Sequence, residues 1–288
     1  MTSIRRFQFS LVALSLVLAS GVLAQQISLP NKADSLKFAV IGDTGTGDQH
    51  EYAVAQKVTE YRNQFKFDFV IMMGDNTYNG DKALNKVFDQ PYKPLLDAGV
   101  KFYAALGNHD TPNQRDYKLF NMGGKQYYTF RPKLGVRFFA LDSNYMSPEQ
   151  LTWLETELKA SGSDWKIAFF HHPLYSSGGT HGSDVALREK LEPMFLKYSV
   201  DVVLSGHDHF YERIKPQKGI QYWVVGGSAK LRQGDINKTD LTEKGFDTGY
   251  SFMAVEIVGD EFHFQTISDK GQTVDSGVIK RRPAPATK

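Results

Sequence analysis

The sequence of 288 residues contains no cysteine. Disulfides therefore play no part in its stability, and no thiolate can act as a nucleophile or bind a metal ion. Any metal site must use nitrogen and oxygen ligands, which favours iron, manganese, zinc or magnesium over a structural zinc cluster. The sequence also lacks a long block of like charge, so it gives no sign of a nucleic-acid-binding stripe.

Net charge is nearly absent as well, since 34 basic residues face 32 acidic ones and the formal charge is +2. Arg5 and Arg6 account for this excess, because the first 24 residues contain no acidic residue. Without that segment the chain is formally neutral. The charge balance therefore indicates neither a nucleic acid nor an anionic membrane as a partner.

The first 24 residues have the pattern of a cleavable export signal. Arg5 and Arg6 precede an apolar run at 7–23, which ends before the small residue Ala24. A membrane anchor is the alternative, but the run contains a Gln, three Ser and a Gly and is short for a span of about 20 residues. We therefore predict an exported, periplasmic or extracellular protein. It would comprise a signal peptide at 1–24, a single domain at 25–282 and a flexible tail at 283–288.

Short apolar runs alternate with amphipathic stretches over the first 205 residues. The apolar runs lie at 36–41, 67–73, 102–106, 136–141, 167–170 and 200–204. The amphipathic stretches lie at 51–63, 84–96, 148–159 and 184–198. This alternation predicts an α/β fold with a largely parallel sheet. Two alternating runs at 251–258 and 261–268, joined by Gly259-Asp260, predict a β-hairpin.

Five of the apolar runs end in polar side chains that can bind metal. They are followed by Asp43, by Asp75, by Asn108-His109-Asp110, by His171-His172 and by His207-Asp208-His209. Ligand sites in α/β sheets lie beyond the carboxyl ends of the strands. So many carboxylates and imidazoles at one edge would be unfavourable without a neutralising cation. Each block alone could be an ordinary polar turn. Together they predict enough ligands for two metal ions, an arrangement that suits phosphoryl chemistry.

In their order along the chain, these blocks resemble the motifs of the calcineurin-like metallophosphoesterase superfamily. The matching segments are Asp43-Thr44-Gly45, Gly74-Asp75-Asn76-Thr77-Tyr78, Gly107-Asn108-His109-Asp110, His171-His172-Pro173 and Gly206-His207-Asp208-His209. Because Tyr78 is retained, the chain is most similar to the small, tartrate-resistant type of purple acid phosphatase. The resemblance implies a four-layer α/β/β/α sandwich, in which helices flank two mixed sheets.

The resemblance also implies a binuclear metal centre, with Fe(III) and a divalent Fe, Zn or Mn ion. The first ion would be held by Asp43, Asp75, Tyr78 and His209. The second would be held by Asp75, Asn108, His171 and His207. Asp75 would bridge the two ions. His172 falls at a variable position of the His-x-Pro motif.

Three further residues are candidates for catalysis. The resemblance implies that His109 contacts the phosphate, with Asp110 beside it, and that His181 lies on a substrate loop. A carboxylate partner for His109 would favour its protonated form. His181 stands in a Gly-rich segment that could close over the substrate. Of the histidines near the centre, only those that bind no metal, namely His109, His172 and His181, have a proton to give to the leaving alcohol.

The expected function is a secreted phosphatase that acts on small phosphate monoesters, in which water activated by two metal ions attacks phosphorus. A phosphodiesterase for nucleotides or phospholipid head groups would have nearly the same ligands, so the motifs leave it open. A non-catalytic phosphate- or metal-binding protein is the alternative of another class. Such a protein would be expected to have lost a ligand, whereas every expected ligand is present here. Neither a nucleic-acid partner nor a stable membrane anchor after signal cleavage is expected.

Overall fold

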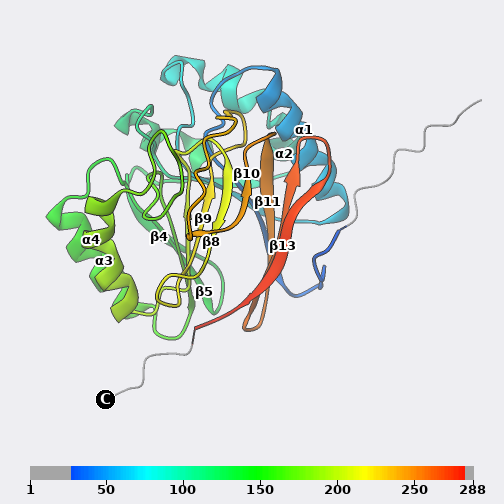
Figure 1. Ribbon diagram of the computed structural model, residues 1–288. Coiled ribbons are helices and arrows are strands. Elements are labelled where there is room, and N and C mark those ends of the chain that lie inside the picture. Colours follow the sequence, from blue (N-terminus) through cyan, green and yellow to red (C-terminus); the bar gives the residue numbers. More distant parts are fainter. Residues whose placement is uncertain (1–26, 283–288) are drawn as a thin grey trace, which may run out of the picture.

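The computed structural model describes residues 27–282, so the predicted export signal at 1–24 and tail at 283–288 lie outside the described residues. Two β-sheets pack face to face, and helices cover the outer face of each (Figure 1). The prediction of an α/β/β/α sandwich with two mixed sheets is therefore confirmed. Within residues 27–282, no helix has the length and apolar character needed to cross a membrane.

The first sheet has six strands in the order β13-β12-β11-β1-β2-β3. Its parallel part consists of β1 (Leu36–Ile41), β2 (Phe69–Met72) and β3 (Lys101–Ala104). Its antiparallel part consists of β11 (Ser251–Val258), β12 (Glu261–Ser268) and β13 (Thr273–Lys280). The predicted hairpin is β11 and β12, and Gly259 between them has a φ of 56°. Glycine tolerates this left-handed conformation better than other residues do.

The second sheet has seven strands in the order β10-β8-β9-β7-β6-β5-β4. Its parallel part consists of β5 (Val136–Ala140), β6 (Trp165–Phe169), β7 (Val202–Ser205) and β9 (Gln221–Val225). Its antiparallel part consists of β4 (Tyr128–Lys133), β8 (Tyr211–Ile214) and β10 (Thr242–Phe246). Each sheet thus combines a block of parallel strands with antiparallel strands. The block lies at one end of the first sheet and in the middle of the second, so the prediction of one largely parallel sheet describes only these blocks.

The helices lie on the outside of the two sheets (Figure 1). α1 (Gln49–Gln64) and α2 (Lys93–Asp97) lie beside the first sheet, and α3 (Pro148–Ala160) and α4 (Val185–Lys197) beside the second. Short helical turns follow β2 and β3: η1 (Asp81–Ala83), η2 (Asn85–Asp89), η3 (Pro112–Asp116) and η4 (Lys118–Phe120). The side chains of Asp48, Ser147 and Asp184 cap α1, α3 and α4 by accepting hydrogen bonds from first-turn N–H groups.

The prediction of one helix over residues 84–96 is wrong. A single turn of π-helix, η2, ends at Asp89, and α2 begins only at Lys93. Pro91 and Pro94 explain the break, because proline lacks the N–H group and its ring clashes with the carbonyl four residues earlier. Pro94 is tolerated because it stands in the first turn of α2, where its N–H would have no partner inside the helix.

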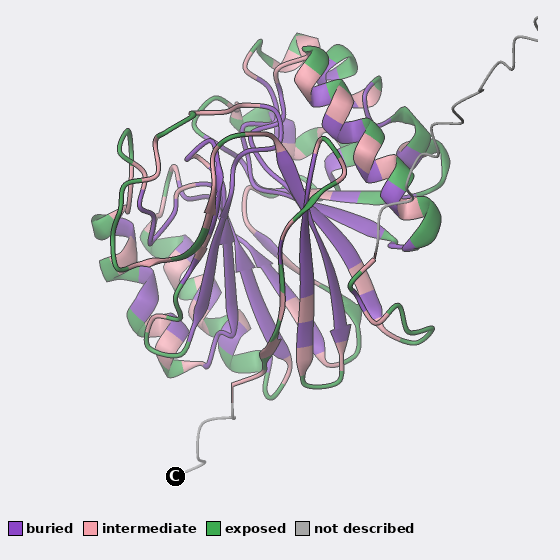
Figure 2. Ribbon diagram, turned by 45° about the vertical axis from the view of Figure 1, so that its right-hand side comes forward, coloured by how far each residue is buried: buried purple, intermediate pink, exposed green. Residues whose placement is uncertain are grey.

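Aromatic side chains fill the space between the two sheets. The rings of Phe38 on β1 and Phe138 on β5 meet edge to face at 5.2 Å between centroids. The rings of Trp223 on β9 and Phe262 on β12 stack at 5.6 Å. Figure 2 shows that the sheets are buried over most of their length, while the helices expose their outer faces. This close packing fixes the two sheets relative to each other, and with them the side chains at the strand ends.

Candidate metal centre

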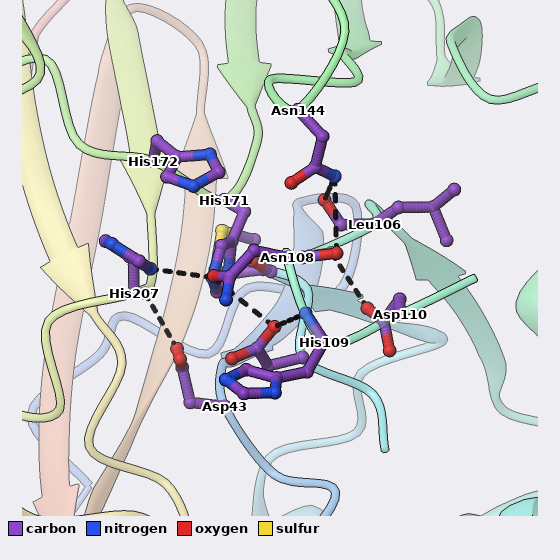
Figure 3. A network of polar contacts seen from close by, with 12 residues as sticks. Asp43, Leu106, Asn108, His109, Asp110, Asn144, His171, His172 and His207 are labelled. Atoms are coloured by element: carbon purple, nitrogen blue, oxygen red, sulfur yellow. Dashed lines mark hydrogen bonds and ion pairs between the residues drawn. The ribbon is translucent and has the colours of Figure 1, made fainter. Parts of the chain in front are cut away.

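The seven predicted metal ligands come together beyond the carboxyl ends of parallel strands of both sheets. Asp43, Asp75 and Asn108 follow β1, β2 and β3 of the first sheet. His171 follows β6 of the second sheet, and His207 and His209 follow β7. The backbone N–H of His207 donates a hydrogen bond to Asp43 Oδ2 at 3.0 Å and so links the two sheets (Figure 3).

The backbone at these strand ends adopts an uncommon conformation. Asp43, Asp75 and His207 have φ values of 55°, 52° and 71°, in the left-handed region that side chains other than glycine rarely adopt. A Cβ atom on Gly74 would lie 2.6 Å from the backbone nitrogen of Gly107, so the two loops pack backbone against backbone. Backbone strain of this kind is concentrated at functional sites, where the surrounding structure must sustain it.

Asp43, Asp75 and His209 form the first group that could hold a metal ion. Their ligand atoms lie within 4.8 Å of one another. Tyr78 Oη lies 3.4 Å from both Asp43 Oδ1 and His209 Nε2. Burial, together with the nearby charge of Asp75, raises the pKa of Asp43 well above its usual range. A cation between these groups would relieve the unfavourable burial of two neighbouring carboxylates.

His171, His172 and His207 form a second group, whose ligand atoms also lie within 4.8 Å of one another. His171 Nδ1 lies 2.9 Å from the Met73 carbonyl oxygen, which can only accept a hydrogen bond. The proton of neutral His171 therefore sits on Nδ1. This leaves the Nε2 lone pair facing Asn108 Oδ1 at 3.0 Å and His207 Nδ1 at 3.1 Å. Burial lowers the pKa of His171, and it lowers that of His207 to about 2. Both imidazoles are thus neutral, the form that binds metal ions.

The two groups fit a binuclear centre. Asp75 belongs to the first group, and its Oδ1 lies 3.4 Å from His171 Nε2 of the second group. Carboxylate, imidazole, amide and phenol donors suit iron, manganese and zinc. The structure therefore brings together the residues predicted to bind two ions. That they do bind ions stays a prediction.

His109 lies at the centre, whereas Asp110 is turned into the neighbouring loop (Figure 3). The His109 N–H donates to Asp75 Oδ1 at 3.0 Å, and its ring lies 4.8 Å from that of Tyr78. The Asp110 carboxylate accepts hydrogen bonds from backbone N–H groups of Asn76, Thr77 and Gly107. It also accepts from the side chains of Asn76 and Gln114. This finding corrects the expectation that Asp110 supports protonation of His109, because its carboxylate instead holds the loop that carries Asp75.

His181 is held against the metal centre by its own loop. The centroids of the His181 and His207 rings lie 4.1 Å apart. The loop is anchored to buried Asp208, whose Oδ2 accepts from Ser176 Oγ at 2.5 Å and from the Gly182 N–H at 3.2 Å. Gly178 packs so closely that a Cβ there would lie 2.4 Å from the same oxygen.

The other side of this loop is tied to the segment that follows β9 and to β8. The Gly179 N–H donates to the Asp235 carbonyl oxygen at 2.8 Å, and Thr180 Oγ1 donates to Asp235 Oδ1 at 2.6 Å. The Ser177 N–H donates to Glu212 Oε2 at 2.9 Å. These contacts dock the His181 loop beside the centre. That the loop closes over the substrate stays a prediction.

His172 and Lys230 also lie near the centre; His172 was expected there as a histidine that binds no metal, whereas Lys230 was not singled out. His172 lies 4.5 Å from His207 between ring centroids, and its Nδ1 is 2.8 Å from Ser143 Oγ. Lys230 Nζ lies 4.0 Å from the ring centroid of Tyr78. Nothing in the sequence indicates this contact, because the two residues are far apart along the chain.

Comparisons with known proteins identify relatives that have the same motifs over most of the chain. A family model described as calcineurin-like phosphoesterase matches residues 36–211, more than half of the sequence. Purple acid phosphatase 7 of Arabidopsis thaliana is 27% identical, over 96% of this chain and 98% of its own length. Tartrate-resistant acid phosphatase type 5 of Rattus norvegicus is 25% identical, over 87% and 93% respectively.

Solved structures of the same fold include GAP50, described as the anchor in the inner membrane complex of Plasmodium. It has a TM-score of 0.74 and 18% identity, over 87% of this chain and 90% of its own. The purple acid phosphatase PPD1 of yellow lupin has a TM-score of 0.70 and 20% identity, over 88% and 55%. At such low identity these structures bear on the fold alone. On the family model and the curated relatives, the chain belongs to the calcineurin-like phosphoesterase family and, like the purple acid phosphatases it resembles, is a phosphoric ester hydrolase.

Proposed function

We propose that the chain is an exported phosphatase that hydrolyses phosphate monoesters at this centre. The observation that carries the proposal is the convergence of two ligand groups with two further histidines, His109 and His181, beside them. Asp43, Asp75, Tyr78 and His209 would hold a ferric ion, and Asp75, Asn108, His171 and His207 a divalent Fe, Zn or Mn ion. When bound, the ions would lower the pKa of a water molecule and offset charge on the phosphoryl group.

Positive charge beside the centre favours a monoester over a diester. A phosphate monoester carries nearly two negative charges at neutral pH, because its second pKa is about 6, whereas a diester carries one. Lys230 lies over the ring of Tyr78. Burial lowers the pKa of His209 to about 3, and the nearby charges of Arg232 and Lys230 add to this shift. These two cations are therefore close enough to attract a dianionic group.

The two further histidines have separate tasks in this proposal. His109, whose N–H is bonded to Asp75, would contact the phosphoryl oxygens and stabilise charge that develops on them. His181 would give a proton to the leaving alcohol. Its exposed ring lies against His207, at the open side of the centre. The docked loop supports this assignment, because a proton donor is effective only when it is held in position.

The substrate preference can be tested by comparing p-nitrophenyl phosphate with its bis(p-nitrophenyl) diester. We expect kcat/KM to be higher for the monoester. A higher value for the diester would favour the phosphodiesterase alternative. No turnover of either ester by protein that contains two metal ions would favour the non-catalytic alternative.

Export and partners are part of the same proposal. Processing after Ala24 would release a chain without a membrane anchor, acting on small phosphorylated substrates and not on nucleic acid. N-terminal sequencing of protein recovered from the periplasm or medium should begin at Gln25. An unprocessed chain that stays in the membrane fraction would contradict export. Elemental analysis of the same preparation identifies the metal pair.

A further inference from the structure

A cavity of about 360 Å³ opens directly beside the metal centre. Its lining includes Asn108, a predicted metal ligand, and His172, which lies 5.0 Å from His171 between ring centroids. The size falls within the range of small-molecule sites. A substrate with its phosphoryl group at the centre could therefore extend its alcohol portion into this space.

One wall of the cavity presents a fixed hydrogen-bond acceptor. The Asn144 amide nitrogen donates to the carbonyl oxygens of Leu106 and Gly107, each at 3.2 Å, and to Asp142 Oδ1 at 3.1 Å. These three acceptors determine the orientation of the amide. Figure 3 shows the amide oxygen of Asn144 on the side toward His172. The wall thus offers an oxygen to a hydroxyl group.

Three acidic residues and no lysine or arginine line the cavity, namely Asp184, Asp142 and Asp110. The Asp110 carboxylate is engaged by the loop after β2, so Asp184 and Asp142 are the carboxylates that bear on a ligand. Asp184 uses Oδ1 to cap α4 through the Leu187 N–H at 2.9 Å. Its Oδ2 has no hydrogen-bond partner among residues 27–282. The cavity is therefore acidic, whereas the part of the metal centre around Tyr78 and His209 is basic, because Lys230 and Arg232 lie there.

We propose that this cavity binds the leaving group, and that it selects monoesters of hydroxylated alcohols without negative charge. This inference rests on the proposed phosphatase function. Hydroxyl groups would donate to Asn144 Oδ1 and to the free oxygen of Asp184. A carboxylate or second phosphate on the alcohol would instead be repelled by the acidic lining, which produces specificity by exclusion.

Glycerol 3-phosphate and 3-phosphoglycerate are a suitable pair of probes. They differ by a carboxylate in place of a hydroxymethyl group, at the end away from the phosphate. We expect kcat/KM to favour glycerol 3-phosphate by at least about tenfold, because like charges brought together at a binding surface are strongly unfavourable.

Asp184→Asn isolates the contribution of one charge. Asparagine caps a helix about as well as aspartate, so α4 should stay capped. The ratio between the two probes should fall by roughly two- to fivefold, the usual effect of one partly exposed charge. Asp97→Asn is the matched control, since Asp97 is exposed on α2, pairs with Lys93 and does not line the cavity. The ratio in this control should equal that of the parent.

Turnover of p-nitrophenyl phosphate separates failure of this inference from failure of the proposed function. Hydrolysis of that ester with equal kcat/KM for the two probes would overturn the subsite and leave the phosphatase standing. An unchanged ratio in Asp184→Asn would also overturn it. If that variant does not fold, Asp184→Ser gives the same test, since serine also caps a helix and carries no charge. Loss of all three activities in metal-loaded parent protein would overturn both proposals.

Discussion

Replacing Asp208 with alanine should impair catalysis by releasing the loop that holds His181. The carboxylate accepts two hydrogen bonds from this loop, from Ser176 Oγ at 2.5 Å and from the Gly182 N–H at 3.2 Å. A hydrogen bond to a charged group contributes about 1.5–3 kcal/mol. Asp208 Oδ1 is buried without a partner among residues 27–282, which offsets part of this gain. We therefore expect the docked state of the loop to lose about 3 kcal/mol.

A loss of this size shifts the docking equilibrium by roughly 10²-fold, since 1.4 kcal/mol corresponds to a factor of ten. The contacts to Asp235 and Glu212 remain, so the loop should loosen and not detach. The expected fall in kcat is therefore roughly 10- to 10²-fold on alkyl phosphates, whose poor leaving groups need protonation. The fall should be smaller on p-nitrophenyl phosphate.

Steady-state kinetics and metal analysis of Asp208→Ala, Ser176→Ala and His181→Ala check this reasoning. Ser176→Ala removes one of the two hydrogen bonds and should give an intermediate loss. If Asp208 acts through His181, adding Asp208→Ala to His181→Ala should cause little further loss. Parent-like kcat on alkyl phosphates in Asp208→Ala, or fully additive losses in the double variant, would refute the argument.

Three further outcomes are expected. Asp75→Asn should lose at least one metal ion and nearly all hydrolysis, because both ligand groups depend on this carboxylate, so two bound ions with near-normal turnover would contradict the assignment. In iron-loaded protein, Tyr78→Phe should abolish a visible charge-transfer band, and an unchanged spectrum would exclude phenolate ligation. Burial raises the pKa of the Glu51 carboxyl from 4.5 to about 9. Between these pH values the carboxyl keeps its proton in the folded protein and loses it in the unfolded chain, so the free energy of unfolding falls as pH rises. Glu51→Gln removes this loss, so its gain in Tm over the parent should grow between about pH 5 and about pH 8, and a constant difference would argue against the shift.

Elements with strong local patterns could be predicted from the sequence. The apolar run at 36–41 became β1 with the same bounds, and the alternating runs at 251–258 and 261–268 became β11 and β12. The amphipathic stretch at 148–159 became α3, which begins at Pro148 and is capped by the Ser147 side chain. In each case the signal lies within a few neighbouring residues, and tertiary packing did not override it.

The site was harder to predict where contacts join distant segments. Motif order identified the residues that converge on the centre, but sequence adjacency misled the interpretation of Asp110, whose partners lie mainly on the loop after β2. The docking of the His181 loop depends on Asp208, Glu212 and Asp235, which come after it in the chain. The cavity depends on how the loop after β5 meets the loops after β3 and β6, a matter of packing between layers.

The origin of the ligands in two different sheets has a consequence for folding. Asp43, Asp75 and Asn108 come from one layer, and His171, His207 and His209 from the other. If ions bind as proposed, each ion has ligands from both sheets. Its binding free energy then adds to the stability of the folded protein. A chelator would then do more than switch off hydrolysis. It would weaken the contact between the two sheets, so heating or proteolysis would separate the sheets at the metal centre first.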